Sequence, residues 1–255
     1  LDIGFLAFNK SIADELKTKG VDACTFHSLG LRLIKKANPK VQVENRKIYW
    51  LIEQTYGNSI TKDQKAYINR VISLIKNTLI FDIDQLIEEY SLDMERVDDE
   101  MVMKIFNLSN KDENVIDFDD MIYRAIDLKR RMFHVLFVDE SQDLNNAQIQ
   151  LITGISDRYI FVGDKFQSIY GFRGANTQAV DDIISNFQCS ELSLPVTWRC
   201  PIEHVERINH MFPEIPFING NNRSGIIKTN SEDLADLILC RFNAPLVSLA
   251  FKCIK

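Results

Sequence analysis

Short apolar runs alternate with amphipathic stretches over the first forty residues and again after residue 130. Ile3–Phe8 and Val135–Val138 are nearly continuous apolar runs, which are typical of strands buried on both faces of a parallel sheet. The same pattern predicts further strands at Val21–Phe26, Tyr159–Val162, near Leu192–Val196, at Gly225–Thr229 and at Leu237–Cys240. Alternation of such strands with helices predicts an α/β fold with a doubly wound parallel sheet. Ligands of such sheets bind at the carboxyl ends of the strands.

Helical spacing fills the segments between these runs. Ser11 and Asp14 have the spacing of a capping box, which predicts a helix that begins at Ser11 and ends at Gly20. Residues 40–113 contain several helical patterns and no convincing strand. Their apolar stripe at Tyr67–Ile75 is expected to be core, and so is Trp50. We therefore expect a helical subdomain, residues 39–111, inserted into the α/β body.

Composition places the chain among ordinary globular proteins, with 255 residues, 45% hydrophobic and 26% charged. The net charge of −6 is unevenly spread, because residues 81–120 hold 14 acidic and 3 basic residues, whereas residues 1–40 hold 4 and 7. A basic face can therefore coexist with an acidic lobe, and nucleic acid remains a possible partner. The five scattered cysteines form no metal-binding spacing with each other or with histidines, which predicts no zinc and a reducing compartment. No apolar run approaches the ~18 residues of a membrane helix, so we expect a cytoplasmic protein without a membrane partner.

Two adjacent carboxylates, Asp139 and Glu140, follow the apolar run at Val135–Val138. Carboxylates at the end of a parallel strand suit a magnesium–phosphate site, where Asp139 would hold the metal and Glu140 would orient and deprotonate an attacking water. The alternative interpretation is an acidic turn that caps the following helix.

The next predicted strand ends in Gly-Asp and is followed by Gln167 and a glycine-rich segment that contains Tyr170, Phe172 and Arg173. Gln167 could donate a hydrogen bond to a terminal phosphate. Aromatic rings beside an arginine are typical of a platform on which nucleic-acid bases stack. The alternative is a glycine-rich loop whose aromatic side chains only pack.

Together, the sequences DESQD at 139–143 and VGDKFQSIYGFRGA at 162–175 resemble motifs II and III of superfamily 1 helicases of the UvrD/Rep/PcrA type. Further segments resemble other parts of that family in the same order: AFNK at 7–10 (motif Ia), TFHS at 25–28 (motif Ib), DFDDM at 117–121, TWRCP at 197–201 (motif IV) and NAPL at 243–246. The resemblance spans nearly the whole chain except the helical insert. It implies a RecA-like parallel sheet of the P-loop NTPase type, formed by residues 1–38 and 112–195. Residues 39–111 would be the helical insert, and residues 196–255 would begin a second RecA-like domain.

The resemblance also implies roles for individual residues. Asp139 would bind Mg²⁺, Glu140 would activate water and Gln167 would sense the γ-phosphate of ATP. From the second RecA-like domain, Arg199 would contact the γ-phosphate and Trp198 would stack on adenine. The residues expected along single-stranded DNA are Phe8, Asn9, Lys10, Thr25, His27, Tyr170, Phe172 and Arg173.

Simpler roles compete for some residues near these motifs. His27 could instead satisfy local backbone groups. Asp119 and Asp120 are expected to favour a helix N-terminus rather than to act in catalysis. Lys129–Arg131 reads as a solvated helix end.

The function that the resemblance implies is an ATP- and Mg²⁺-dependent DNA helicase. It would move on single-stranded DNA, 3′ to 5′, and act at junctions of single- and double-stranded DNA. The sequence contains no Gly-x-x-x-x-Gly-Lys-[Ser/Thr] phosphate loop, so we expect little or no ATPase activity from these residues alone. The alternative is a non-catalytic DNA-binding or regulatory relative that has lost this loop, but the presence of Glu140, Gln167 and Arg199 favours the motor.

Overall fold

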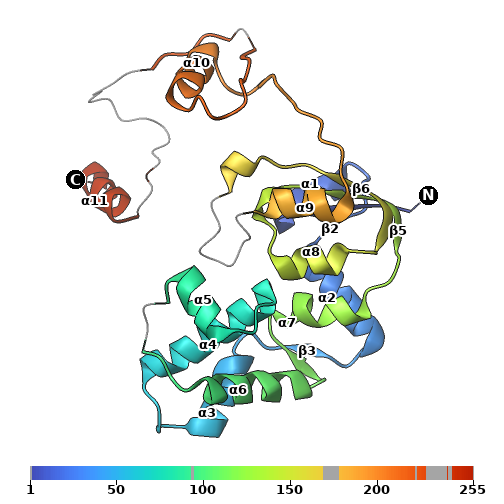
Figure 1. Cartoon of the computed structure of the whole chain (residues 1–255), viewed down its shortest axis with the longest axis vertical. Helices are drawn as coiled ribbons and strands as arrows, with labels where there is room; N and C mark the ends of the chain where they lie inside the picture. The colour runs from blue at the N-terminus through green and yellow to red at the C-terminus, as the bar shows by residue number, and fades with distance from the viewer. Residues whose placement is uncertain are drawn as a thin grey trace. The chain divides into compact units, whose positions relative to one another are not determined.

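The computed structural model of the protein describes residues 2–92, 95–168, 178–221, 223–227, 240 and 243–254. The chain divides into two compact units, Leu1–Glu191 and Leu192–Lys255. Figure 1 shows the whole chain, and each unit is described by itself below.

A four-stranded parallel sheet organises the first unit, as the apolar runs predicted. Its order is β2-β1-β5-β6, where the strands are β1 (Ile3–Ala7), β2 (Ala23–Thr25), β5 (Phe133–Val138) and β6 (Ser156–Phe161). Leu6 lies opposite both Cys24 and Val138, and Val138 lies opposite Phe161. The segments that follow the four strands therefore emerge at one edge of the sheet.

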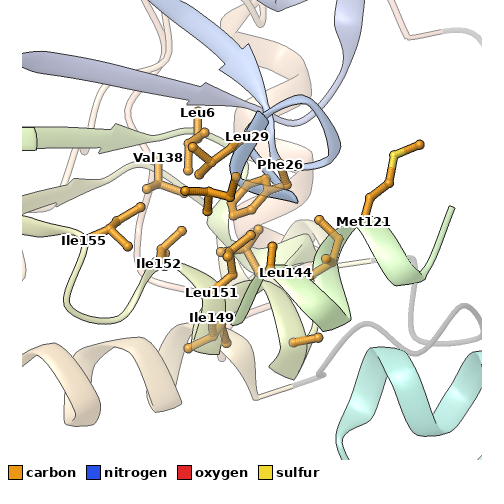
Figure 2. Close-up of a cluster of buried hydrophobic side chains, with 14 of the residues drawn as sticks. Leu6, Phe26, Leu29, Met121, Val138, Leu144, Ile149, Leu151, Ile152 and Ile155 are labelled. Carbon is orange, nitrogen blue, oxygen red and sulfur yellow. The ribbon is translucent and has the colours of Figure 1, made fainter. Parts of the chain in front are cut away.

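Alternate residues of β1 enter different clusters, as expected for a strand covered on both faces. Leu6 joins a large core with side chains of α2 (Phe26–Ala37), α7 (Asp120–Tyr123), α8 (Asn146–Ile152) and α9 (Ala179–Phe187). Figure 2 shows Leu6, Phe26, Leu29 and Val138 grouped above the side chains of α8. Ala7 instead packs with Ala13 of α1 (Lys10–Thr18). Both faces of β1 are thus buried, which explains its continuous apolar sequence.

The first helix begins one residue earlier than its sequence predicted. Asn9 is extended and its side chain accepts a hydrogen bond from Ile12 N at 3.0 Å, so Asn9 and not Ser11 caps α1. The predicted Ser11–Asp14 capping box is therefore wrong, because Ser11 already lies within the first helical turn. Gly20 follows the helix in the left-handed region, at φ +80°, as a terminating glycine requires.

Four helices pack around a second hydrophobic core at the side of the unit away from the sheet (Figure 1). They are α3 (Lys47–Tyr56), α4 (Lys62–Thr78), α5 (Ile83–Tyr90) and α6 (Asp99–Lys111). The Tyr67–Ile75 stripe forms the centre of this core, as predicted. Trp50 is not core, because it is 57% exposed. The helix α3 buries Ile48 and Ile52, and Trp50, two positions from each, lies on the outward side.

Two short strands pair with each other where the chain enters and leaves this helical region. β3 (Gln42–Val43) pairs in parallel with β4 (Val115–Ile116) and forms a separate two-stranded sheet. The sequence analysis did not predict them, because two residues are too few to show an alternating pattern. Neither strand joins the four-stranded sheet.

Among its described residues, the second unit contains α10 (Ile202–Met211), α11 (Asn243–Ile254) and a parallel bridge between Val196 and Asn219. The strand predicted near Leu192–Val196 is wrong, since Leu192 and Leu194 are 90% and 88% exposed and only Val196 pairs. Residues 225–227 have no regular structure, and 228–229 and 237–239, which complete the two other predicted strands, lie outside the described residues. The NAPL segment begins α11. A second RecA-like domain at 196–255 stays a prediction.

No helix in the described part of the chain combines the length and the apolar character needed to cross a membrane.

Candidate functional site

The acidic loop begins directly at the end of β5. Asp139 continues the pairing of the strand through a hydrogen bond from its N–H to Leu6 O at 3.0 Å. Its Oδ1 accepts the N–H of Glu140 at 3.0 Å. Glu140 then adopts the left-handed conformation, with φ 50° and ψ 44°, which is uncommon for non-glycine residues. The chain thus turns sharply where both predicted carboxylates lie.

Gln142 connects this loop to the loop that follows β6. Its Nε2 donates to Glu140 Oε2 at 2.6 Å, and its Oε1 accepts the N–H of Asp164 at 3.1 Å. The Gln142 side chain is buried, so these bonds fix the position of the Glu140 carboxylate.

Gly163 allows the two loops to approach this closely. A Cβ at Gly163 would lie 2.5 Å from Ser141 Oγ and 2.7 Å from Gln142 Oε1. The backbones also bond directly, since Ser141 N–H donates to Val162 O at 2.9 Å. The position therefore requires a residue without a side chain.

Asp164 extends the network to Gln167. Its Oδ2 accepts from Gln167 Nε2 at 2.9 Å, and its Oδ1 accepts the N–H of Phe166 at 3.0 Å. The structure therefore brings two predicted site residues, Glu140 and Gln167, into one chain of hydrogen bonds through Gln142 and Asp164. The sequence analysis did not assign roles to Gln142 and Asp164, although both lie within the quoted motifs.

Asp139 has the chemistry of a magnesium ligand. Its Oδ2 has no hydrogen-bond or ion-pair partner within the described part of the chain, and carboxylate oxygen is a preferred ligand of Mg²⁺. Among the described residues, no group of three or more His, Cys, Asp or Glu side chains gathers to hold a metal.

A groove of about 780 Å³ lies beside the segments that follow β1 and β2. Five predicted DNA-contacting residues from two separate motifs line it: Phe8, Asn9, Lys10, Thr25 and His27. Other lining residues come from α4, from the DFDDM segment and from the segment that leads into α8: Arg70, Ser73, Asn77, Phe118, Asp119, Met121, Asp143, Asn145 and Gln148. The α4 residues were missed, although 70, 73 and 77 share one helix face by their spacing.

The N-termini of α1 and α2 lie at this groove. Asn9 caps α1, and Thr25 Oγ1 caps α2 by accepting the N–H of Ser28 at 3.2 Å. Helix N-termini carry a partial positive charge that favours anions. Lys10 of α1 adds an exposed ammonium group to the same lining, whereas Lys17 is paired at 3.0 Å with Asp14, which also lines the groove. This part of the groove therefore suits phosphate.

His27 contributes an aromatic ring to the groove. Its ring centroid lies 4.2 Å from that of Phe118, at an interplanar angle of 33°. Burial lowers the pKa of His27 to about 4, so the ring is neutral at pH 7. Phe118, which the sequence analysis did not single out, is 52% exposed. The pair offers flat apolar surface rather than charge.

The segments that form the groove and the two loops also match a known protein family. A family model described as the UvrD/REP helicase N-terminal domain matches residues 8–188, which include the groove and both loops. This chain belongs to the UvrD/REP helicase N-terminal domain family. The four-stranded parallel sheet is accordingly that of a RecA-like helicase domain, as the motifs implied.

Several helicases are similar to this UvrD/REP family member. The ATP-dependent DNA helicase Rep of Buchnera aphidicola is 31% identical over 186 residues, covering 64% of this chain and 28% of that protein. The ATP-dependent DNA helicase PcrA of Staphylococcus epidermidis is 28% identical over 210 residues, covering 69% and 28%. That of Staphylococcus aureus is 29% identical over 181 residues, covering 61% and 24%. The chain thus matches about a quarter of the length of these relatives, 24–28%.

Asp117 and Asp120 of the DFDDM segment belong to a buried ionic cluster. Lys76 Nζ lies 2.7 Å from Asp117 Oδ2 and 2.8 Å from Asp120 Oδ1, and Lys47 Nζ lies 2.9 Å from Asp120 Oδ2. Asp120 also begins α7, where it and Asp117 each accept the N–H of the other, as expected for acids at a helix N-terminus. The sequence analysis missed both lysines, and their bonds make Asp120 chiefly a structural residue.

The remaining predicted site residues fall in two places. Trp198, 77% exposed, and Arg199, also exposed, lie in the second unit. Thr197 Oγ1 shapes this turn by accepting the N–H groups of Arg199 and Cys200, each at 3.3 Å. Tyr170, Phe172 and Arg173 lie outside the described residues.

Proposed function

We propose that this chain forms part of the motor core of an ATP-dependent DNA helicase, which holds single-stranded DNA in the groove beside β1 and β2. The observation that carries the proposal is the common sheet edge. The residues after β1 and β2 line one groove, and the residues after β5 and β6 form one hydrogen-bonded pair of loops. Parallel sheets bind ligands at this edge.

The paired loops are assigned to ATP. Asp139 would hold Mg²⁺, which when bound neutralises charge on the phosphates. Glu140, held by Gln142, would orient and deprotonate the attacking water, and Gln167 would contact the γ-phosphate. Arg199 and Trp198 would reach the nucleotide from the second unit, as an arginine finger and as a ring that stacks on adenine.

The groove is assigned to single-stranded DNA. Lys10 and the N-termini of α1 and α2 suit its phosphates, while Phe8, His27 and Phe118 offer rings for its bases. Stacking tolerates every base, so binding would not depend on sequence. Tyr170, Phe172 and Arg173 are proposed to extend this surface.

The domain division and the direction of movement belong to the same proposal. Residues 1–38 and 112–195 would be the first motor domain, 39–111 its helical insert and 196–255 the start of the second. Closure of the two motor domains on ATP and their opening after hydrolysis would drive steps along the strand, 3′ to 5′, at junctions with duplex. The alternative, a non-catalytic DNA-binding relative, would need only the groove. The bond between Gln142 and Glu140, which orients a carboxylate with no part in DNA binding, favours the enzyme.

The test is fluorescence anisotropy with a labelled oligothymidine over a range of salt concentrations. Lys10→Ala should weaken binding and reduce the slope of log K against log salt by about 0.7, the value for one phosphate contact on a single strand. Lys19→Ala is the matched control, since Lys19 is exposed just after the same helix and does not line the groove. Absence of binding by the unmodified chain, or equal effects of the two variants, would contradict the proposal.

A phosphate-release assay on the same chain tests the expectation from its missing phosphate loop. We expect little or no turnover, with or without the oligothymidine. Robust DNA-stimulated turnover would show that expectation to be wrong.

A further inference from the structure

Asn77, near the end of α4, joins two other segments that line the groove. Its Nδ2 donates to Asp119 Oδ1 at 3.0 Å, and its Oδ1 accepts from Asn145 Nδ2 at 2.7 Å. The same Nδ2 donates to Ser73 O at 2.8 Å, which fixes the amide against its own helix. Asn77, Ser73, Asp119 and Asn145 all line the groove. A single amide therefore connects three parts of one wall.

Each partner of Asn77 adjoins residues that the proposed function uses. Asp119 directly follows Phe118, whose ring stacks beside His27. Asn145 caps α8 through a reciprocal pair of bonds with Gln148, and it lies five positions after Glu140 in the chain. Asn77 thus lies between the aromatic pair and the helix that follows the acidic loop.

The end of α4 is held firmly on both sides of Asn77. Lys76 forms buried ion pairs with Asp117 and Asp120. The carbonyl of Thr78 accepts from Asn146 Nδ2 at 3.0 Å. The position of Asn77 is therefore set before any ligand binds, as a residue that orients others requires.

Only a carboxamide can make both of these bonds at this position. It donates to a carboxylate and accepts from another amide at the same time. A carboxylate in its place could accept from Asn145 but would face Asp119 as a like charge. The identity of the side chain, and not merely its size, is therefore what the wall requires.

We propose that Asn77 is a positioning residue that holds Asp119, and with it Phe118, in the place where the groove receives single-stranded DNA. The inference rests on the proposed function of the groove. In this role Asn77 need not contact the DNA itself.

The test is a double-mutant cycle on the full chain, read as the Kd for labelled oligothymidine. Asn77→Asp should raise the Kd at least fivefold, because it replaces the donor to Asp119 with a like charge. Asp119→Asn alone should lower the Kd, because it removes one negative charge from the lining. In the Asp119→Asn background, Asn77→Asp should cost a clearly smaller factor than it does alone, because the bond between residues 77 and 119 is restored with donor and acceptor exchanged, while the bond to Ser73 O is lost in both backgrounds.

Two further variants keep the result interpretable. Asn58→Asp adds the same charge at an exposed position outside the groove, and it should change the Kd less than twofold. Asn77→Ala removes the bonds without adding charge, so it serves if Asn77→Asp does not fold, and it should raise the Kd about threefold. Thermal melts on every variant establish that the folded protein is being measured.

The outcomes separate this inference from the function on which it rests. If the unmodified chain does not bind oligothymidine, the proposed function of the groove fails. If it binds and the Asn77 variants leave the Kd unchanged, the inference is overturned. It is equally overturned if Asn77→Asp costs the same factor in both backgrounds, or if Asp119→Asn restores the melting temperature of Asn77→Asp but not its Kd.

Discussion

Gln142 Nε2 lies 2.6 Å from Glu140 Oε2, and the same side chain accepts the N–H of Asp164 at 3.1 Å. One buried amide thus joins the loop after β5 to the loop after β6. Because Glu140 is also held in a left-handed turn, its carboxylate is fixed from the backbone and from the side chain. Such fixed geometry is what a general base requires.

Replacement of this carboxylate should therefore remove hydrolysis and spare binding. In any form of the protein found to hydrolyse ATP, Glu140→Gln should lower turnover by ~10²–10⁴-fold, the usual contribution of a general base. Phosphate release gives the rate, and titration with a fluorescent nucleotide gives the affinity. Glu191→Gln, at an exposed position, is the control. Wild-type turnover in Glu140→Gln would remove Glu140 from this role.

Gly163→Ala should disturb both loops, because its Cβ would lie 2.5 Å from Ser141 Oγ and 2.7 Å from Gln142 Oε1. We expect a loss of about 1–3 kcal/mol in the free energy of unfolding, measured with urea. Adding Ser141→Ala removes the nearer of the two atoms and should recover part of the loss. An unchanged free energy of unfolding in Gly163→Ala would refute the close approach of the loops.

Lys76→Met should be among the most destabilising changes in the first unit. Burial alone would raise the pKa of Asp120, but Lys76, Lys47 and Arg124 together lower it, so the ionised carboxylate depends on these cations. Removing one member of a buried ion pair costs about 3–5 kcal/mol. Lys19→Met, which breaks only the exposed pair with Glu15, should leave the urea midpoint almost unchanged. Equal urea midpoints for the two variants would contradict the burial of the cluster.

His27 should make the fold less stable in mild acid. Burial lowers its pKa from 6.5 to about 4 in the folded chain, so between these values the unfolded chain binds a proton that the folded chain does not. Stability is therefore complete above pH 6.5 and falls as the pH drops, by about 2 kcal/mol at pH 5. His27→Phe keeps a ring beside Phe118 and should lose less stability between pH 7.5 and pH 5. Identical losses in both proteins, measured by urea unfolding, would show that His27 is not responsible.

Much of this organisation was predictable from the sequence, for physical reasons that differ by element. β1 is buried on both faces, and β5 is buried on one face and half-buried on the other, so their apolar runs predicted them directly. Because parallel strands end at one edge, the motifs after β1 and β2 could be expected to meet, and their residues do line one groove. The Tyr67–Ile75 stripe was equally clear, since helical spacing marks one buried face.

Other features depend on contacts between distant residues, which no local pattern carries. Lys76 is buried because it pairs with Asp117, a residue 41 positions further along the chain. A lysine in a helical pattern otherwise predicts a solvated face. Trp50 was expected in the core because it is large and apolar, but its place on α3 turns it outward. Leu192 and Leu194 show the same limit, because an apolar run becomes a strand only where a neighbouring strand pairs with it.

Photochemical crosslinking tests the central claim, that the groove beside β1 and β2 holds single-stranded DNA, most directly. An oligothymidine that contains 4-thiothymidine would be bound to the full chain and irradiated, and the adducts mapped by mass spectrometry. The account predicts adducts within residues 8–17, 25–31 or 118–121, which Asn77→Asp reduces and excess unlabelled oligothymidine abolishes. Adducts confined to other segments, with none on these three, would contradict it.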